Sequence, residues 1–451
     1  MLHTPFSPSD AIVKGDARAA HRTHPPHLGD RLDGVGTYAE SAAVTVIHSR
    51  DVPLPEATLN TIQPRRSPSR RTRVRTTFRT ALGAKALANA FVATFALAFA
   101  FGALAQTSET ASDAARLVRD GKLYLGQGDC ALAQYFFQEA LKREESNPEA
   151  LVGKGRALAC QNSYASAIDA FRQAIDAHPS HVPAYVHLAL TYQDQYLLDP
   201  ASHAGRLADA LDVLQQAERA GGDDATIQNT KGIVLYQAGD LGGAQQALER
   251  AIDLAISAGM SDAERSTIQV NLGRTYRDQD QLELAQQAFR RAVVLDPTNA
   301  SAHNNLGNVM YRLGDCDGAE FELSQAVALA PNSLSAVSQL AIVLFECGDV
   351  ADSIPYFERA LQLDGAVFTP PLFTYLARAY LQQGRLDDAV RRAQQGALLP
   401  PESADAHYYL GRAYEARRGS EDIANAQRAY ERALELDPGF DAARGALNDL
   451  R

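Results

Sequence analysis

The residues best suited to chemistry in this chain include a small group of histidines. His178 and His181 flank a Pro-Ser turn, and His187 lies on the next predicted helix. A metal site needs ligands that converge on one point, and a carboxylate or thiolate usually joins the histidines. The spacing of these three residues does not predict such convergence. We therefore expect exposed loop histidines and no metal site.

Motifs for catalysis are also missing from the sequence. Gly153-Lys154-Gly155 is too short for a phosphate-binding loop and lacks its Ser or Thr. No Ser, Cys or Lys stands in a recognisable nucleophile motif. The acidic residues are scattered along predicted helices, as is typical of solvated surfaces. We expect a protein that is not an enzyme and that holds no cofactor.

These residues are set on a chain organised by an internal repeat of about 34 residues, clearest over residues 270–297. A small residue recurs in the first half of each copy, at Gly121, Gly155, Ala189, Gly232, Gly273, Gly307, Ala341, Ala377 and Gly411. A second small residue follows at Ala140, Ala174, Ala217, Ala251, Ala292, Ala326, Ala360, Gly396 and Ala433. Two ladders with one period predict stacked pairs of helices, and hence an all-α solenoid.

The small residues have a physical role in such a stack. Two antiparallel helices approach closely only where no side chain separates them, so Gly273 and Ala292 permit the approach. Tyr276 and Phe289 would fill the space beside them. Glycines between the two helices of several copies predict left-handed caps that end the first helix, at Gly128, Gly239, Gly314, Gly348 and Gly384.

The repeat resembles the tetratricopeptide repeat, over about nine copies between residues 112 and 438. The resemblance implies a right-handed superhelical solenoid of helix-turn-helix units, and residues 440–450 would form a short closing helix. Asp120 and Lys154 stand where the family prefers leucine. Copy three carries extra residues between Tyr192 and Ala210, and more lie between copies four and five, around Gly259. These departures affect local register and leave the fold unchanged.

In this family the first helices line a concave groove, which implies that the groove is the binding face. The residue after the small one would point into it, and five of these nine residues are basic: Lys122, Arg156, Arg274, Arg378 and Arg412. Asn308 holds the same position. Asn271 and Asn305 resemble the asparagine ladder by which some members hold a peptide backbone, and Tyr311, Tyr375 and Tyr409 would add flat apolar surface. The alternative is that arginine is simply a common occupant after this glycine. The carboxylate clamp of the family has no counterpart, since Val270 stands at its first lysine.

Within this architecture the four cysteines form two pairs. Cys130 and Cys316 begin second helices, and Cys160 and Cys347 lie near the ends of the next first helices, 30 and 31 residues later. Those two helix ends meet at one edge of the solenoid. We expect the disulfides Cys130–Cys160 and Cys316–Cys347, each stabilising by roughly 3–4 kcal/mol, in an oxidising compartment. The alternative is four unpaired small core residues.

The region before the repeats resembles an export signal. Eight basic residues and no acidic residue lie within residues 65–85, and residues 86–105 are almost wholly apolar and end in A-x-A. We expect residues 74–105 to be a signal peptide cleaved between Ala105 and Gln106. An uncleaved membrane anchor and a buried soluble helix are the alternatives. Residues 1–73 would be disordered, or untranslated if synthesis starts at Val74. Residues 106–451 would be the solenoid with its closing helix.

The charge is distributed unevenly between these parts. Residues 1–105 hold 13 Lys and Arg against 7 Asp and Glu, about +6, so the net −11 leaves −17 on the body. An acidic body argues against nucleic acid as a partner. The hypothesis is an exported, periplasmic or extracytoplasmic scaffold that binds protein or an acidic or extended peptide and organises an envelope or secreted complex. A glycan-handling or polysaccharide-export scaffold, a targeting subunit of a separate enzyme, and a protein anchored by residues 86–105 remain alternatives.

Overall fold

The computed structural model describes residues 112–363 and 370–451. The predicted N-terminal extension 1–73, the predicted leader 74–105 and the Ala105–Gln106 junction lie outside the described residues. Every regular element within the described ranges is a helix. Among the described residues, no helix is both long and apolar enough to cross a bilayer.

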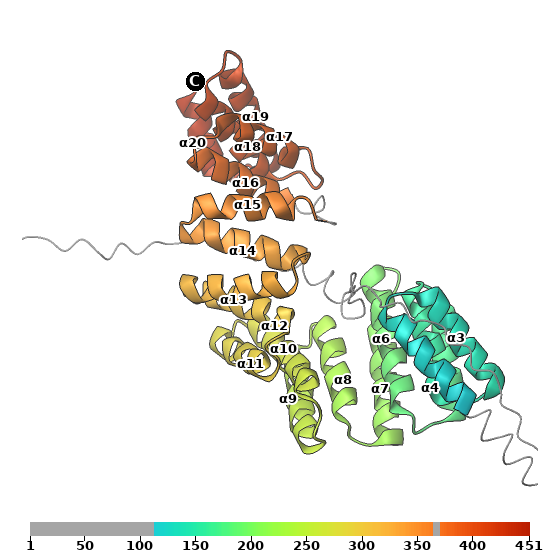
Figure 1. Ribbon diagram of the computed structural model, residues 1–451. Helices are drawn as coiled ribbons and strands as arrows, with labels where there is room; N and C mark the ends of the chain where they lie inside the picture. Colours follow the sequence, from blue (N-terminus) through green and yellow to red (C-terminus); the bar gives the residue numbers. More distant parts are fainter. Residues whose placement is uncertain (1–111, 364–369) are drawn as a thin grey trace, which may run out of the picture.

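Helices alternate along the chain in antiparallel pairs (Figure 1). The first helices of the pairs are residues 112–126, α4 (Pro148–Cys160), α6 (Val182–Leu198), α8 (Ala225–Gln237), α10 (Asp262–Asp278), α12 (Ala300–Arg312), α14 (Leu334–Cys347), α16 (Pro370–Gln382) and α18 (Ala404–Arg417). The second helices are α3 (Cys130–Arg143), α5 (Tyr164–Ala177), α7 (Arg206–Gly221), α9 (Leu241–Ser257), α11 (Leu282–Leu295), α13 (Cys316–Leu329), α15 (Val350–Ala360), α17 (Leu386–Ala397) and α19 (Asp422–Leu436). The chain closes with α20 (Asp441–Asp449). The predicted all-α solenoid of about nine repeats and a closing helix is confirmed.

Short polar side chains fix where many helices begin. Asp129, Asn147 and Asp315 each accept a hydrogen bond from a backbone N–H of the first turn of the following helix. Ser261 and Glu264 form a reciprocal capping box at the start of α10. Each cap satisfies a backbone donor that the helix itself leaves unpaired.

The predicted left-handed positions end the first helices. Gly314 has φ of 85° and Gly348 has φ of 112°, and the three other predicted capping glycines also have positive φ. Asn162, Asp280 and Arg418 hold the equivalent position in three further copies, with φ of 58°, 59° and 55°. A search for glycine alone misses these three, although Asn and Asp tolerate this conformation better than most residues.

The two helices of a repeat meet at the small residues. A Cβ atom added at Gly273 would lie 2.6 Å from the ring of Phe289, which is fully buried. Gly155 meets Phe171 at 2.5 Å in the same way. The predicted close approach is therefore present, because an aromatic ring of the second helix occupies the space that a side chain would need.

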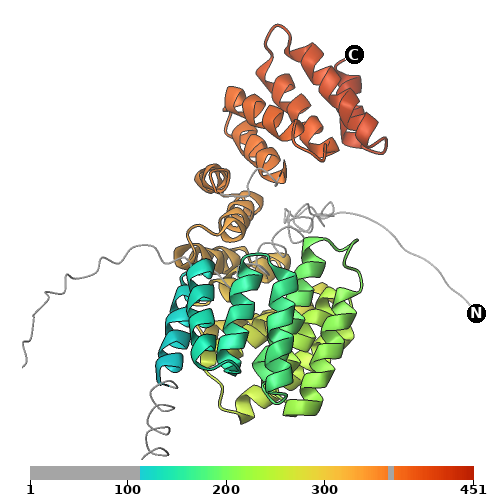
Figure 2. The same ribbon diagram turned by 90° about the vertical axis from the view of Figure 1, so that its right-hand side faces the viewer.

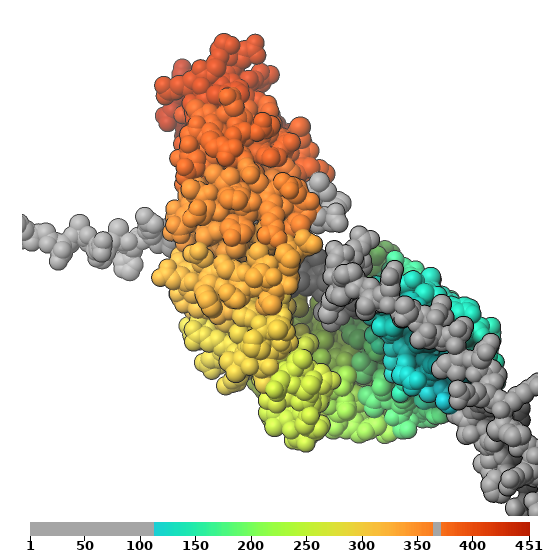
Figure 3. Space-filling view, in the orientation of Figure 1, coloured from blue at the N-terminus to red at the C-terminus, as the bar shows by residue number. Residues whose placement is uncertain are grey.

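The stacked repeats form two limbs joined through the middle of the chain (Figures 1 and 2). One buried cluster runs through repeats five to nine, from Val270 to Ala413, and another runs through repeats two to four, from Leu151 to Val234. The space-filling view shows the yellow repeats around α9–α11 at the bend between the limbs (Figure 3). The longer helices of this fold, α6, α9 and α10, have 17 residues each and flank the predicted insertions.

Candidate functional site

The first helices of consecutive repeats lie side by side, so their side chains contact each other across repeat boundaries. We call the surface formed by these side chains, from the helix of residues 112–126 to α18, the first-helix face. Side chains one position after, two before and four after the small residue contribute to it. The predicted binding residues were expected on this face. Its middle, the region around Arg378 and its two ends differ in chemistry.

The middle region is a row of amides between α8 and α14. Asn271 Nδ2 donates to Asn229 Oδ1 at 3.0 Å, and Asn308 Nδ2 donates to Gln339 Oε1 at 3.3 Å. Asn305 is only 4% exposed; its Nδ2 donates to the carbonyl of Ser301 and its Oδ1 accepts from Arg277. The structure thus brings the three predicted asparagines into one row. Their amide groups already bond within the protein, which the sequence pattern did not reveal.

Arg274 stands at the edge of this row. Its guanidinium carbon lies 5.6 Å from the centre of the Tyr236 ring, within the range of a cation–π contact. The Tyr236 hydroxyl donates to the carboxylate of Asp278. Burial and then this hydrogen bond raise the pKa of Tyr236 above its usual value. No carboxylate of the described residues pairs with Arg274, so its charge is held in place by a ring and is not neutralised.

Arg378 is surrounded much more completely. The rings of Phe345, Tyr375 and Tyr409 have their centres 4.7, 4.9 and 5.1 Å from its guanidinium carbon. Glu346 Oε1 lies 3.4 Å from its Nη1 atom. Arg378 is therefore part of the packing of this region, with its charge balanced inside the protein.

The predicted tyrosines of this region do not share one open face. Tyr375 is 4% exposed, and burial raises its pKa well above the usual range. Tyr311 is half-buried, and burial followed by the nearby Glu346 carboxylate raises its pKa to about 12. Rings in such positions cannot stack on a sugar without rearrangement. This arrangement counts against the glycan-handling alternative.

The two ends of the first-helix face hold the remaining predicted basic residues. Lys122 Nζ pairs with Glu149 Oε2 at 2.8 Å. Arg412 Nη1 donates to the Tyr408 hydroxyl at 3.1 Å, and its Nε lies 3.7 Å from Glu415. Both residues are exposed, and ion pairs of this kind contribute little to stability.

Arg156 differs from these end residues because it is half-buried and has no ion-pair partner among the described residues. Burial lowers the pKa of its guanidinium. His187 on α6 stacks on Phe171, with ring centres 6.0 Å apart, and burial followed by the charge of Arg156 lowers its pKa to about 3. His187 lies on a helix, as predicted, but the expectation that its ring is exposed is wrong. The ring is half-buried against Phe171, which keeps it neutral.

Other groups near the face were missed by sequence reasoning. Asp194 at the end of α6 has its pKa raised to about 6 by burial. His303 is 6% exposed and bridges Glu322 Oε2 at 2.6 Å and the carbonyl of Pro297 at 3.1 Å. Arg277 is 6% exposed and lies four positions after Gly273, at the helix face that points to the next repeat. Within the described ranges, no group of three or more His, Cys, Asp or Glu is arranged to hold a metal ion.

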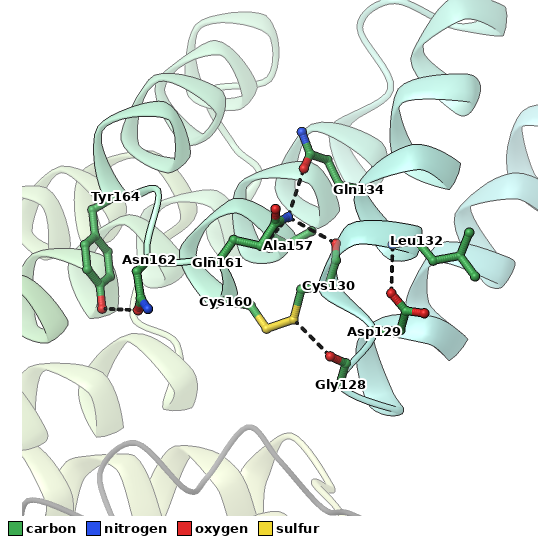
Figure 4. The surroundings of a disulfide bond; sticks show 10 residues. All are labelled: Gly128, Asp129, Cys130, Leu132, Gln134, Ala157, Cys160, Gln161, Asn162 and Tyr164. Carbon is green, nitrogen blue, oxygen red and sulfur yellow. Dashed lines mark hydrogen bonds between the residues drawn. A yellow bond between two sulfur atoms is a disulfide. The ribbon is translucent and has the colours of Figure 1, made fainter.

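The cysteines lie where the helix edges meet (Figure 4). The Cα atoms of Cys130 and Cys160 are 6.1 Å apart, and those of Cys316 and Cys347 are 6.0 Å apart. Both separations satisfy the geometric requirement for a disulfide. Each pair joins the first residue of a second helix to the last residue of the next first helix. The predicted pairing rule therefore has the geometry that it needs.

Family comparisons agree with this architecture. A family model described as the cilia and flagella-associated protein 70 C-terminal domain matches residues 194–448, more than half of the chain. A tetratricopeptide repeat model matches residues 119–182. The chain therefore belongs to the tetratricopeptide repeat proteins, in the family that the first model describes. Folds of this kind are generally non-catalytic scaffolds for protein–protein interaction.

Individual proteins resemble parts of the chain. A probable UDP-N-acetylglucosamine–peptide N-acetylglucosaminyltransferase SPINDLY from Hordeum vulgare is 26% identical over 165 residues, which are 37% of this chain and 16% of that protein. The chain thus matches about a sixth of the length of this relative.

Among solved structures, a thermophilic TPR protein of Thermus thermophilus is 24% identical over 44% of this chain and 99% of its own, with a TM-score of 0.39. YrrB, described as a TPR protein with an unusual peptide-binding site, is 22% identical over 44% of this chain and 97% of its own, with a TM-score of 0.38. The APC/C hetero-tetramer Cut9-Hcn1 is 16% identical over 75% of this chain and 66% of its own, with a TM-score of 0.48.

Proposed function

We propose that this protein is a scaffold that binds an acidic or extended peptide segment of a protein partner on the first-helix face. One observation carries the proposal: Arg274 and Arg156 lie on that face without a carboxylate partner among the described residues. The body that presents them has a net charge of about −17. An uncompensated guanidinium in an acidic protein favours a ligand that supplies the carboxylate, because the charge-assisted hydrogen bond then replaces lost hydration.

The amide row extends this surface for a backbone. Asn271 lies half-buried beside Arg274, in the row of amides on the first-helix face. Amide groups next to a fixed arginine suit a ligand that offers backbone N–H and carboxylate groups together. The proposal includes no nucleic-acid partner, since a phosphate backbone requires a clustered basic face. The chain would act by recognition, without catalysis and without a cofactor.

We also propose that the scaffold works outside the cytoplasm, where it organises an envelope or secreted complex. The basic run 65–85, the apolar run 86–105 and the A-x-A ending support export. Two cysteine pairs at disulfide distance fit an oxidising compartment. In this proposal the membrane is contacted only through residues 86–105, and only if the leader stays uncleaved. N-terminal sequencing of the native protein should return Gln106 or a close neighbour, and an intact residue 1–64 segment would contradict export.

Chemical crosslinking and pull-down with residues 106–451 would identify the partner. The affinity of that partner is then measured for Arg274→Glu with Asn271→Ala, since both side chains are only half-buried. The pair should weaken binding without lowering the melting temperature by more than a few degrees. Unchanged affinity would mean that the partner binds elsewhere on the molecule. A partner that proves to be an enzyme would favour the targeting-subunit alternative over the envelope scaffold.

A further inference from the structure

A polar depression of about 310 Å³ lies between α3, α4 and α5. Its lining residues are Gln134, Lys154, Leu158, Ser166, Asp169, Ala170 and Gln173. Lys154 is only two positions from Arg156 on α4, so the two side chains project to opposite sides of the helix. The depression therefore opens on the side of the second helices and is separate from the first-helix face. Its volume lies at the lower end of the range for small-molecule sites.

Lys154 occupies a position that is apolar in most copies. The residue before the small one is leucine at Leu188, Leu272, Leu306, Leu340, Leu376 and Leu410. One further copy has a lysine at this position, Lys231. Lys231 Nζ pairs with Glu218 Oε1 of the preceding second helix at 2.8 Å.

The counterpart of Glu218 is absent beside Lys154. Glu218 follows Ala217, and the residue that follows the equivalent Ala140 is Leu141. No carboxylate of the described residues lies within ion-pair distance of Lys154, which is half-buried. An ammonium group without a carboxylate partner can pair with the anionic group of a ligand through a charge-assisted hydrogen bond. The two lysines thus share one position in the repeat, and only Lys231 is compensated by the protein.

The lining of the depression also includes a negative charge. Asp169 on α5 lines the depression and forms no ion pair within the described part of the chain. Ser166 and Gln173 on the same helix supply a hydroxyl and an amide. The site therefore presents a cation from α4, and an anion with neutral polar groups from α5.

Gln134 on α3 lines the depression next to the disulfide Cys130–Cys160. Gln161 Nε2 donates to Gln134 Oε1 at 2.9 Å and to the carbonyl oxygen of Cys130 at 3.2 Å (Figure 4). Cys130 and Cys160 join α3 to the end of α4 beside these bonds. Gln134 Oε1 thus accepts a hydrogen bond from α4 beside the disulfide, and its amide N–H groups remain available to a ligand.

We propose that this depression binds a small polar zwitterion of amino-acid size. Its carboxylate would pair with Lys154 and its ammonium with Asp169. A volume of about 310 Å³, at the lower end of the range for small-molecule sites, suits a ligand of amino-acid size. Gln134, Gln173 and Ser166 supply hydrogen bonds to a polar side chain, so L-glutamine has the fitting size and chemistry.

Isothermal titration calorimetry of residues 106–451, with each polar amino acid at millimolar concentration and L-glutamine as reference, tests this inference. Lys154→Leu introduces the leucine that six other copies have at this position and should lower the affinity at least about tenfold, as loss of a charge-assisted bond implies. Lys231→Leu is the matched control and should leave the affinity unchanged. Equal affinity in Lys154→Leu and the wild type, or no binding of any polar amino acid, overturns the proposal.

A second comparison separates the two charges and does not depend on the folding of the Lys154 variant. The wild type should reject both N-acetyl-L-glutamine, which lacks the ammonium, and L-glutamine amide, which lacks the carboxylate. Asp169 is exposed, so Asp169→Asn should fold normally. This variant should bind N-acetyl-L-glutamine as well as it binds L-glutamine, and it should still reject L-glutamine amide. If Asp169→Asn discriminates as the wild type does, the assigned orientation and the site are wrong.

Discussion

Arg274 and Arg378 hold the same position in their repeats and have opposite surroundings. Arg274 rests on one ring, that of Tyr236, and no described carboxylate pairs with it. Arg378 has three rings within about 5 Å and an ion pair with Glu346. The difference teaches that a repeat position fixes where a side chain points, whereas the neighbouring repeats fix what it can still bind. We assign Arg274 to the ligand and Arg378 to the packing of its region.

The two regions also differ in whether a disulfide joins their repeats. Cys316–Cys347 joins repeats six and seven next to the Arg378 cluster, whereas no disulfide joins repeats four and five around Arg274. Cys316→Ala with Cys347→Ala should cost roughly 3–4 kcal/mol in unfolding free energy, because the unfolded chain loses its cross-link. Urea unfolding of the oxidised protein measures this. Equal stability of the variant and the wild type would show that the bond does not form.

Arg378→Ala should destabilise the protein by about 2 kcal/mol. The change removes contacts with three rings and leaves the partly buried Glu346 carboxylate without its cation. Arg274→Ala, the matched control, should cost less than about 0.5 kcal/mol, as is usual for a surface substitution. Thermal unfolding of the two variants measures the contrast. A larger loss for Arg274→Ala would reverse the assignment of the two arginines.

Arg274→Glu should weaken binding of an identified acidic partner by about tenfold, equivalent to about 1.4 kcal/mol. The exposed charge pair should also weaken as salt concentration rises, because ions screen it. Binding measured between 50 and 300 mM salt tests both effects. Arg378→Lys, which keeps the charge within the cluster, should change the affinity by less than threefold. A larger effect of Arg378→Lys would place the ligand on the C-terminal limb.

The smallest predicted effect concerns Asp194, which lies on α6, away from both Arg274 and Arg378. Burial raises the pKa of this carboxyl to about 6, so the folded state binds its proton more tightly than the unfolded state does. Its ionised form therefore destabilises the protein above pH 6, and the penalty disappears as pH falls toward 4. Asp194→Asn should raise stability at pH 7.5 by about 1 kcal/mol after allowance for solvent, and by almost nothing at pH 4.

The pH profile of Asp194→Asn must be read against that of His187 on the same helix. His187 has its pKa lowered to about 3, so the wild type loses stability as pH falls from about 6.5 toward 3. The wild type and the variant both lose this stability in acid, because both contain His187. The difference between their unfolding free energies therefore reports on Asp194 alone. A stability difference that grows toward acid pH would contradict the assignment of a raised pKa.

The sequence by itself determined the repeat and much of the local structure. Two ladders of small residues predicted nine helix pairs, because close helix approach admits only small side chains at each crossing. Capping glycines such as Gly314 and the positions of the cysteines at helix edges followed from the same period. These features depend on residues within one repeat or on a fixed relation between adjacent repeats, so the period alone is enough to locate them.

Only the tertiary structure decided which polar groups are already satisfied. Asn305 carries the ladder pattern, yet Arg277 and Ser301 occupy its amide. Lys154 and Lys231 read alike in sequence, and one finds Glu218 while the other faces a depression. Such outcomes depend on the particular side chains that neighbouring helices bring within about 4 Å, and these vary between copies although the backbone does not. The physical reason is that the repeat period fixes the direction in which each side chain points, whereas the pairing of its charge depends on specific contacts between repeats.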